Sequence, residues 1–313
     1  MVLKMSPTVE EIAELGTYLL AEGPHWDDET QSLYFVDIVG RSVNKYVPST
    51  KKHTQLKFDK NPSFIIPVKG YSDRFIVSLN KDITLLTWDG VSSAPTKMET
   101  IATFDNTPEK SENRLNDGKA DPLGNLWAGT MNMGSDHTTG TLVQGTLSSL
   151  SNKEVKEHVS NVCISNGLAW SKDSKKFYYI DSAVRRVDQF DFDAKNLTLS
   201  NRQPLFTFEK HGIAGSPDGQ TIDAEGNLWV AACQGDKVLK IDTKTPETLL
   251  GSVEIPDHQV TSVCIGGPEL NVLYVTTANL KLPGADETKP IKGAIYKVTG
   301  LGMKGLPGDR VKL

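Results

Sequence analysis

Short hydrophobic segments with the character of β-strands recur along the whole chain. Six of them place an aromatic side chain at the same position among β-branched and small residues, a composition that favours strands over helices. No apolar residues recur at the three- and four-residue spacing of an amphipathic helix. Successive aromatic positions are 41 to 52 residues apart, which is typical of a propeller blade. The six aromatic residues are Tyr34, Phe75, Trp127, Tyr178, Trp229 and Tyr274.

Each segment lies inside a larger repeated unit. Residues 121–125 (DPLGN) and 223–227 (DAEGN) precede two of the aromatic segments and combine Asp, Gly and Asn, which are typical of tight hairpin turns. Another strand-like segment follows each aromatic one, and a third precedes each turn. The repeat predicts an all-β chain, a six-bladed β-propeller with four-stranded blades, forming a single domain over residues 1–313. A β-sandwich or barrel also has many short strands, but neither requires six copies of one unit.

The two ends of the chain carry separate signals. We expect residues 12–15 to close the ring by joining the last blade, whereas residues 8–11 (TVEE) contain the only pattern typical of a helix start. The C-terminal tripeptide Val311-Lys312-Leu313 is close to the peroxisomal address Ser-Lys-Leu, although valine replaces its small first residue.

Charge and composition narrow the classes of partner. The formal net charge of −5 gives no basic surface of the kind that nucleic-acid binding requires. No apolar run reaches the roughly 18 residues of a membrane span, and the first residues lack an apolar signal segment. The three cysteines form no CxxC pair, which indicates free thiols in a reducing compartment. We therefore expect a cytoplasmic monomer acting on a small molecule, with a peroxisomal location as the alternative.

One position of the repeat is polar in most of the predicted inner strands. In four of the six repeats an acidic or amide residue precedes a glycine there. An Asp-Gly or Asn-Gly pair taken alone favours a turn, but four such positions in register predict side chains that meet on the axis of the ring. The residues at this position are Glu22, Ser63, Asp117, Asn166, Asp218 and either Thr261 or Ser262.

Acidic groups that meet on one axis need a counter-charge. Like charges a few ångströms apart repel one another, and a divalent cation removes that repulsion. Carboxylate and amide oxygens are the ligands that Ca²⁺ and Mg²⁺ prefer, and the six histidines show no zinc-ligand spacing. We expect one divalent cation on the axis, with Ca²⁺ as the first choice and Mg²⁺, Mn²⁺ or Zn²⁺ as alternatives.

Several longer motifs resemble the gluconolactonase, regucalcin and luciferin-regenerating enzyme family. They include EGPHWD, RLNDGKADPLGNLWAGTM, ISNGLAWS and PDGQTIDAEGNLWVA, and the similarity runs from about residue 12 to the C-terminus. Other segments, SFIIP, LLTWDGVSSAPT and PLFTFEKH, are most similar to the luciferin-regenerating branch known from fireflies. The family is a six-bladed propeller, which agrees with the repeat.

The resemblance implies roles for individual residues. The family's cation ligands match Glu22, Asn166 and Asp218, and Asp218 also matches its general base. The bound cation would polarise a carbonyl oxygen while Asp218 takes a proton from the attacking water. The substrate-contacting R-x-N-D-G motif of the family matches Arg114, Asn116 and Asp117.

The resemblance leaves more than one function open. Where some vertebrate members have a substrate-binding glutamate, this chain has Asn132, Met133 and Gly134. The apolar Met133 and Gly134 suit a flat aromatic substrate better than a sugar. We expect a divalent-metal-dependent hydrolase, a luciferin-regenerating enzyme acting on oxyluciferin. A sugar lactonase of the gluconolactonase type and a calcium-binding regulator without turnover are the alternatives. A WD-repeat interaction propeller is disfavoured because the G-H and W-D motifs typical of that repeat are missing.

Overall fold

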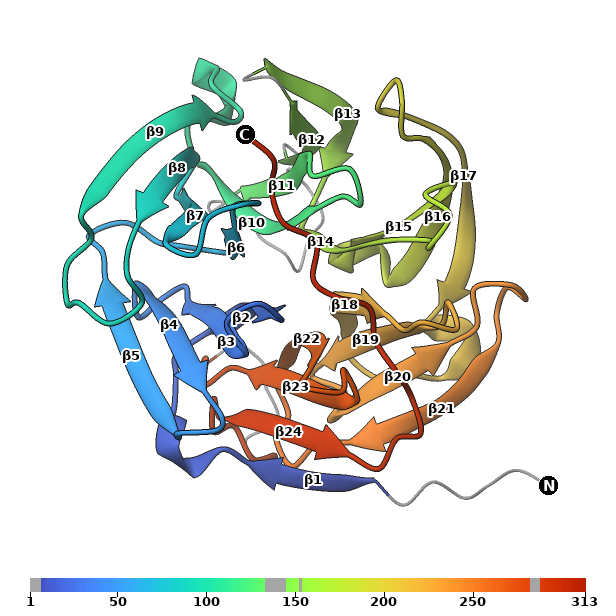
Figure 1. Cartoon of the computed structure of the whole chain (residues 1–313). Helices are drawn as coiled ribbons and strands as arrows, with labels where there is room; N and C mark the ends of the chain where they lie inside the picture. The colour runs from blue at the N-terminus through green and yellow to red at the C-terminus, as the bar shows by residue number, and fades with distance from the viewer. Residues whose placement is uncertain (1–6, 133–144, 152–153, 282–287) are drawn as a thin grey trace.

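Six sheets of four antiparallel strands surround a central axis in the computed structural model, which describes residues 7–132, 145–151, 154–281 and 288–313 (Figure 1). The fold is therefore an all-β six-bladed β-propeller with four-stranded blades, as the repeat predicts. The helical segments within these ranges are single turns, and none of them is long and apolar enough to cross a membrane. They are η1 (Ala13–Leu15), η2 (Pro108–Lys110), η3 (Ser182–Val184) and η4 (Glu209–His211).

The strands of each blade follow one another from the axis outward, except that the last blade takes its outermost strand from the N-terminus. Blades 1 to 3 consist of β2 (Ala21–Asp27), β3 (Ser32–Asp37), β4 (Ser42–Val47) and β5 (Lys52–Lys57); β6 (Ile65–Pro67), β7 (Arg74–Leu79), β8 (Asp82–Thr87) and β9 (Lys97–Thr103); and β10 (Asn113–Ala120), β11 (Leu126–Asn132), β12 (Gly145–Ser151) and β13 (Glu154–Val162). Blades 4 to 6 consist of β14 (Ser165–Trp170), β15 (Lys176–Asp181), β16 (Arg186–Asp193) and β17 (Thr198–Thr207); β18 (Ser216–Ile222), β19 (Leu228–Cys233), β20 (Lys237–Ile241) and β21 (Leu249–Glu254); and β22 (Val260–Gly266), β23 (Val272–Thr277), β24 (Ile295–Thr299) and β1 (Thr8–Glu11).

The recurring aromatic residues lie in the second strand of every blade, and all six are buried. In blades 3 and 5 the preceding turn holds the ring in place. Trp127 Nε1 donates a hydrogen bond to Asp121 at 3.0 Å, and Trp229 Nε1 donates to Asp223 at 3.1 Å. Asp121 also accepts the backbone N–H of Asn125. One carboxylate therefore closes the turn and anchors the indole, which explains why DPLGN and DAEGN recur before these tryptophans.

The N-terminal segment closes the ring, as predicted, but it does so at a different place. β1 pairs with β24 from Thr8 opposite Thr299 to Glu11 opposite Tyr296, so the closing strand precedes the predicted residues 12–15, which continue into η1. The helix start predicted at residues 8–11 is wrong. The exposed edge of β24 offers these residues a full set of backbone partners, which outweighs a local capping pattern.

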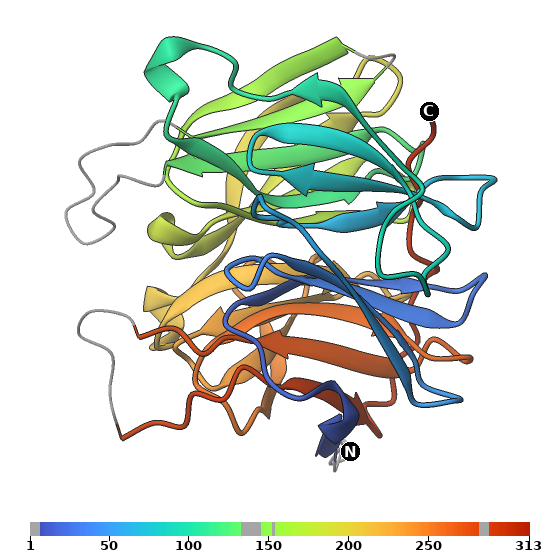
Figure 2. The same cartoon turned by 90° about the vertical axis from the view of Figure 1, so that its left-hand side faces the viewer.

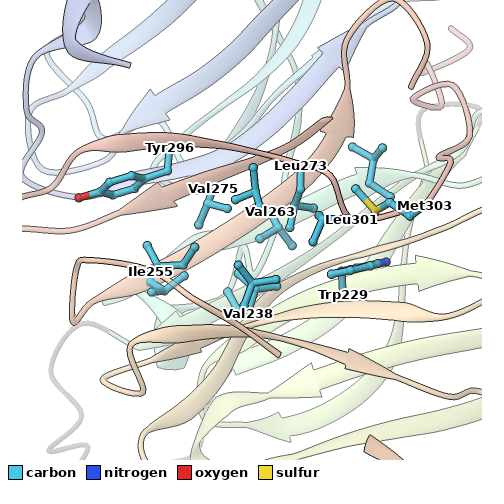
Figure 3. Close-up of a cluster of buried hydrophobic side chains, with 14 of the residues drawn as sticks. Trp229, Val238, Ile255, Val263, Leu273, Val275, Tyr296, Leu301 and Met303 are labelled. Carbon is cyan, nitrogen blue, oxygen red and sulfur yellow. The ribbon is translucent and has the colours of Figure 1, made fainter. Parts of the chain in front are cut away.

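Apolar side chains fill the space between neighbouring blades. Between blades 5 and 6, Trp229 and Val238 pack against Val263 and Leu273, and Leu301 from the segment after β24 joins the same cluster (Figure 3). Burying such side chains contributes about 1.5–3 kcal/mol each. This packing holds the inner strands in a common register around the axis.

The chain after β24 crosses the face of the ring that points toward the viewer in Figure 1 and lies along one face of the disc in Figure 2. It is attached at blade 5, where the backbone N–H of Ala224 donates to Lys304 O at 2.7 Å. At blade 2 the backbone N–H of Val311 donates to Pro67 O at 3.0 Å. This C-terminal segment therefore covers one end of the axis.

Candidate functional site

The acidic and amide positions of the repeat lie in the innermost strands, near the start of β2, β14 and β18 and in the middle of β10. Glu22 belongs to β2, Asp117 to β10, Asn166 to β14 and Asp218 to β18. At each of them the pairing with the second strand shifts register through a β-bulge. A bulge redirects a side chain out of the regular pleat. Because the bulges recur at one level of the ring, the four side chains come from different blades to the same region.

The glycine that follows each position permits close approach between blades. A Cβ atom on Gly167 would lie 2.8 Å from the backbone oxygen of Asp218, and one on Gly219 would clash with Ser262. Only a residue without a side chain lets adjacent inner strands come so near. The turn interpretation of these dipeptides is therefore wrong, even for Asp117-Gly118, which lies inside β10.

Asn116 and Arg114 connect blade 3 to blade 4. Asn116 Nδ2 donates to Asn166 Oδ1 at 3.0 Å and to the backbone oxygen of Ser165 at 2.9 Å. Arg114 Nη1 donates to Asn116 Oδ1 at 2.7 Å. The amide of Asn116 is thereby oriented by contacts on both sides, and it presents Arg114 beside the amide group of Asn166.

Ser182 extends this network to blade 5. Asn166 Nδ2 donates to Ser182 Oγ at 2.8 Å, and the Ser182 hydroxyl donates to the backbone oxygen of Pro217 at 2.7 Å. Pro217 directly precedes Asp218 in β18. The orientation of Asn166 and the position of Asp218 are therefore coupled through one buried hydroxyl.

Glu22 and Asp218 form a pair of interacting carboxyl groups. Burial raises the pKa of Glu22 well above its ordinary value, and repulsion from Asp218 and Asp117 raises it further. Burial and repulsion from Asp117 likewise raise the pKa of Asp218, while a hydrogen bond with Glu22 acts in the opposite direction. Burial raises the pKa of Asp117 to about 6. The three carboxyl groups therefore carry more negative charge than their surroundings stabilise.

Arg114 provides part of the counter-charge. Burial lowers the pKa of its guanidinium to about 10, although attraction to Glu22 and Asp218 opposes this shift. The group consequently stays protonated at neutral pH. One positive charge faces the Glu22–Asp218 pair, and a planar donor of this kind suits oxygen-rich ligands.

The donor set fits a divalent cation. Glu22 and Asp218 offer carboxylate oxygens and Asn166 offers an amide oxygen, which are the ligands that Ca²⁺ and Mg²⁺ take. A divalent charge beside the two acids would relieve the repulsion that raises their pKa values. Within the ranges that the structure describes, no group of three His, Cys, Asp or Glu side chains is arranged to hold a metal ion. The third donor of this set is the amide of Asn166, which is not one of those residue types.

The site differs in exposure from one side to the other. Glu22 and Asn166 are 8% and 4% exposed, whereas Arg114, Asn116 and Asp218 are partly exposed. The buried pair forms the floor, and a molecule arriving from solvent meets the other three first. This arrangement separates residues that can hold an ion from residues that can orient a ligand.

Cys233 is a member of the site that the sequence analysis missed. It ends β19, lies partly buried beside Asp218 and shares a hydrogen bond with it. Burial raises the pKa of its thiol well above the ordinary value, and the negative charges of Asp218 and Glu22 add to the shift. The thiol therefore stays protonated and can donate to Asp218. All three cysteines are free, as predicted.

The residues that replace the vertebrate substrate-binding glutamate, Asn132, Met133 and Gly134, are only partly described by the structure. Asn132 is buried at the end of β11 and donates through Nδ2 to Asn113 Oδ1 at 2.9 Å. It is therefore engaged in the blade. Met133 and Gly134 lie outside the described residues.

Comparisons with known proteins identify the family of the chain. Residues 20–279 match the family described as "SMP-30/Gluconolactonase/LRE-like region". The chain belongs to this family. Regucalcin of Xenopus laevis is 38% identical over 307 residues, which cover 96% of this chain and 98% of the relative. The similarity extends over nearly the whole propeller.

Two solved structures are similar to nearly the whole chain. A luciferin-regenerating enzyme is 57% identical with a TM-score of 0.94, covering 98% of this chain and 100% of that one. A calcium-binding protein, regucalcin, from Agrobacterium tumefaciens has a TM-score of 0.84 at 23% identity, covering 98% of both chains. The second likeness concerns the fold alone.

Proposed function

We propose that this family member is a divalent-metal-dependent hydrolase of the luciferin-regenerating type, acting on oxyluciferin. The observation that carries the proposal is the pairing of Glu22 with Asp218 beside Asn166, with Arg114 and Asn116 on the solvent side. The similarity to a luciferin-regenerating enzyme at 57% identity favours that substrate over a sugar lactone. We further propose Ca²⁺ as the ion, a single monomeric domain and a cytoplasmic location.

The proposed roles follow from exposure and charge. Glu22, Asn166 and Asp218 would hold the cation, which when bound polarises a substrate carbonyl oxygen. Asp218 is the partly exposed acid, so its carboxylate can accept the proton of a water that approaches from solvent. Arg114 and Asn116 orient the substrate oxygen through charge-assisted and neutral hydrogen bonds. Cys233 donates to Asp218 and keeps that carboxylate correctly oriented.

The deciding experiment replaces Asp218 by Asn, which keeps the size and one ligand oxygen. Turnover of oxyluciferin, gluconolactone and an aryl ester is measured with metal in excess, and bound metal is counted separately. We expect kcat to fall about 10²-fold or more, as for the loss of an acid–base group. Asp173→Asn, at an exposed turn after β14, is the matched control and should keep full activity.

Two results would contradict the proposal in different ways. Full activity of Asp218→Asn at saturating metal would remove Asp218 as the base. If the unmodified protein turned over none of the three substrates while still binding Ca²⁺, the calcium-binding regulator would replace the hydrolase. Turnover of gluconolactone alone would instead favour the sugar lactonase.

A further inference from the structure

A second cavity lies at the other end of the axis, beneath the C-terminal segment. Its volume is about 500 Å³, within the range of small-molecule sites. Its walls come from the last residues of several inner strands and from the segment that crosses them. We propose that this cavity is a second binding site, for a small organic anion with a flat apolar body.

The cavity is separate from the Glu22–Asp218 site. The inner strands run in one direction through the ring, with the site residues near their beginnings and the cavity residues near their ends. In β2, Glu22 is followed four residues later by Trp26, which lines the cavity, and this spacing corresponds to about 13 Å of strand. Between the two, a void of about 20 Å³ on the axis is lined by Asp117, His25 and Lys119, among others. A void of that size accommodates about one water.

Unpartnered polar atoms lie in the residues that form the walls of the cavity. Trp26, Trp170 and His25 line the cavity and are 2%, 5% and 9% exposed. The indole Nε1 of both tryptophans and the Nε2 of His25 are buried without a hydrogen-bond partner among the described residues. An indole N–H can only donate, and a buried donor without an acceptor costs about 1–3 kcal/mol. The walls of the cavity therefore contain polar groups for which the described residues supply no partner.

The lining carries four basic side chains, Lys69, Lys119, Lys172 and Arg310, and three acidic ones, Asp28, Glu29 and Asp309. A preference for an anion therefore depends on the lysine at the floor. Lys119 is partly exposed at the floor, where its ammonium donates to the backbone oxygen of Gln220 at 2.8 Å and keeps further donors for a ligand. Lys69 and Lys172 are exposed residues of the wall. Arg310 is already bound by Asp27 and Glu29. Apolar residues of the lining supply the surface for a flat apolar body; they are Pro122, Leu123, Leu306 and Pro307.

The C-terminal segment supplies the outer wall. Leu306, Pro307, Gly308, Asp309 and Arg310 all line the cavity, between the attachments of the segment at blades 5 and 2. A Cβ on Gly308 would lie 2.9 Å from His25 Nε2. The segment therefore passes directly over the unpartnered ring nitrogen, and glycine at this position allows the backbone to come so close to the ring.

The test uses 2-naphthoate as an anionic probe and 2-naphthamide as its uncharged counterpart, titrated calorimetrically into the full-length protein. We expect naphthoate to bind more tightly than the amide. Lys119→Met should weaken naphthoate binding about 10-fold or more, because it removes a charge-assisted hydrogen bond. Lys172→Glu, at an exposed position, should weaken binding without affecting folding. Lys304→Met, on the same segment but outside the lining, is the matched control and should bind normally.

Arg114→Met distinguishes probe binding in the cavity from probe binding at the Glu22–Asp218 site, since it alters only the latter. Equal naphthoate affinity in this variant supports the cavity as the binding place. The proposal is overturned if no heat of binding appears up to millimolar probe, which would leave a cavity filled by water only. It is also overturned if the amide binds as tightly as the acid, or if Arg114→Met weakens binding while Lys119→Met and Lys172→Glu do not.

Discussion

His25 should make the protein less stable in mild acid. Its side chain is 9% exposed, and burial lowers its pKa from 6.5 to about 4. Lys119 and Arg310 lower the pKa further by repulsion, while Asp27 opposes them. Between pH 6.5 and 4 the His25 imidazole therefore binds a proton in the unfolded chain but not in the folded protein. The free energy of unfolding consequently falls as the pH falls through this window.

The size of the effect follows from the two pKa values. At pH 5 an unfolded histidine is almost fully protonated and the folded one is mostly neutral, which costs about 2 kcal/mol relative to pH 8. For a chain of 313 residues, an unfolding entropy of about 2.1 cal/mol/K per residue converts this into about 3 °C of Tm. His25→Gln cannot titrate, so this part of the acid sensitivity should disappear.

The assay compares Tm between pH 8 and pH 5 for the unmodified protein and His25→Gln at constant Ca²⁺. Every other titrating group is common to both proteins, so the difference between the two curves isolates His25. We expect the variant curve to be flatter by about 3 °C over this range. Parallel curves would refute the reasoning, because they would mean that His25 titrates alike in the folded and unfolded protein.

Two further expectations concern the site and the C-terminus. Arg114→Lys should raise KM several-fold while bound metal stays unchanged, because a planar fork becomes a point charge; loss of the metal would show that Arg114 supports the ion site instead. Removing Val311-Lys312-Leu313 should leave a fluorescently imaged protein equally diffuse in the cytoplasm, since Val311 is buried and hydrogen-bonded to blade 2 and so is not presented as a free address. A change from punctate to diffuse signal would restore the peroxisomal alternative.

The repeat made most of the fold predictable. Trp127 and Trp229 make the same hydrogen bond because Asp121 and Asp223 close equivalent turns, and such local chemistry is visible in sequence. The exact strand that closes the ring was harder to predict from the sequence. The strand at residues 8–11 exists only because the edge of β24 is open nearly 300 residues later, and no local pattern carries that information.

The axial cluster was predictable for the same reason that the blades were. Glu22, Asp117, Asn166 and Asp218 occupy one register position, so their convergence follows from the repeat alone. Cys233 was missed because it comes from the second strand of blade 5 and reaches Asp218 across the sheet. Ser182 was missed because it lies in the turn after β15, where the blades differ in sequence.

The same logic explains why the second cavity leaves no trace in the repeat. At the far ends of the inner strands the corresponding residues differ from blade to blade, with Trp26 in one and Trp170 or Ile222 in others. The wall that completes the cavity comes from residues 306–310, which belong to no blade. A site built by symmetry can be inferred from equivalent positions. A site whose residues differ from blade to blade can be found only in the folded structure. Only there do a buried histidine, two indoles and the end of the chain become neighbours.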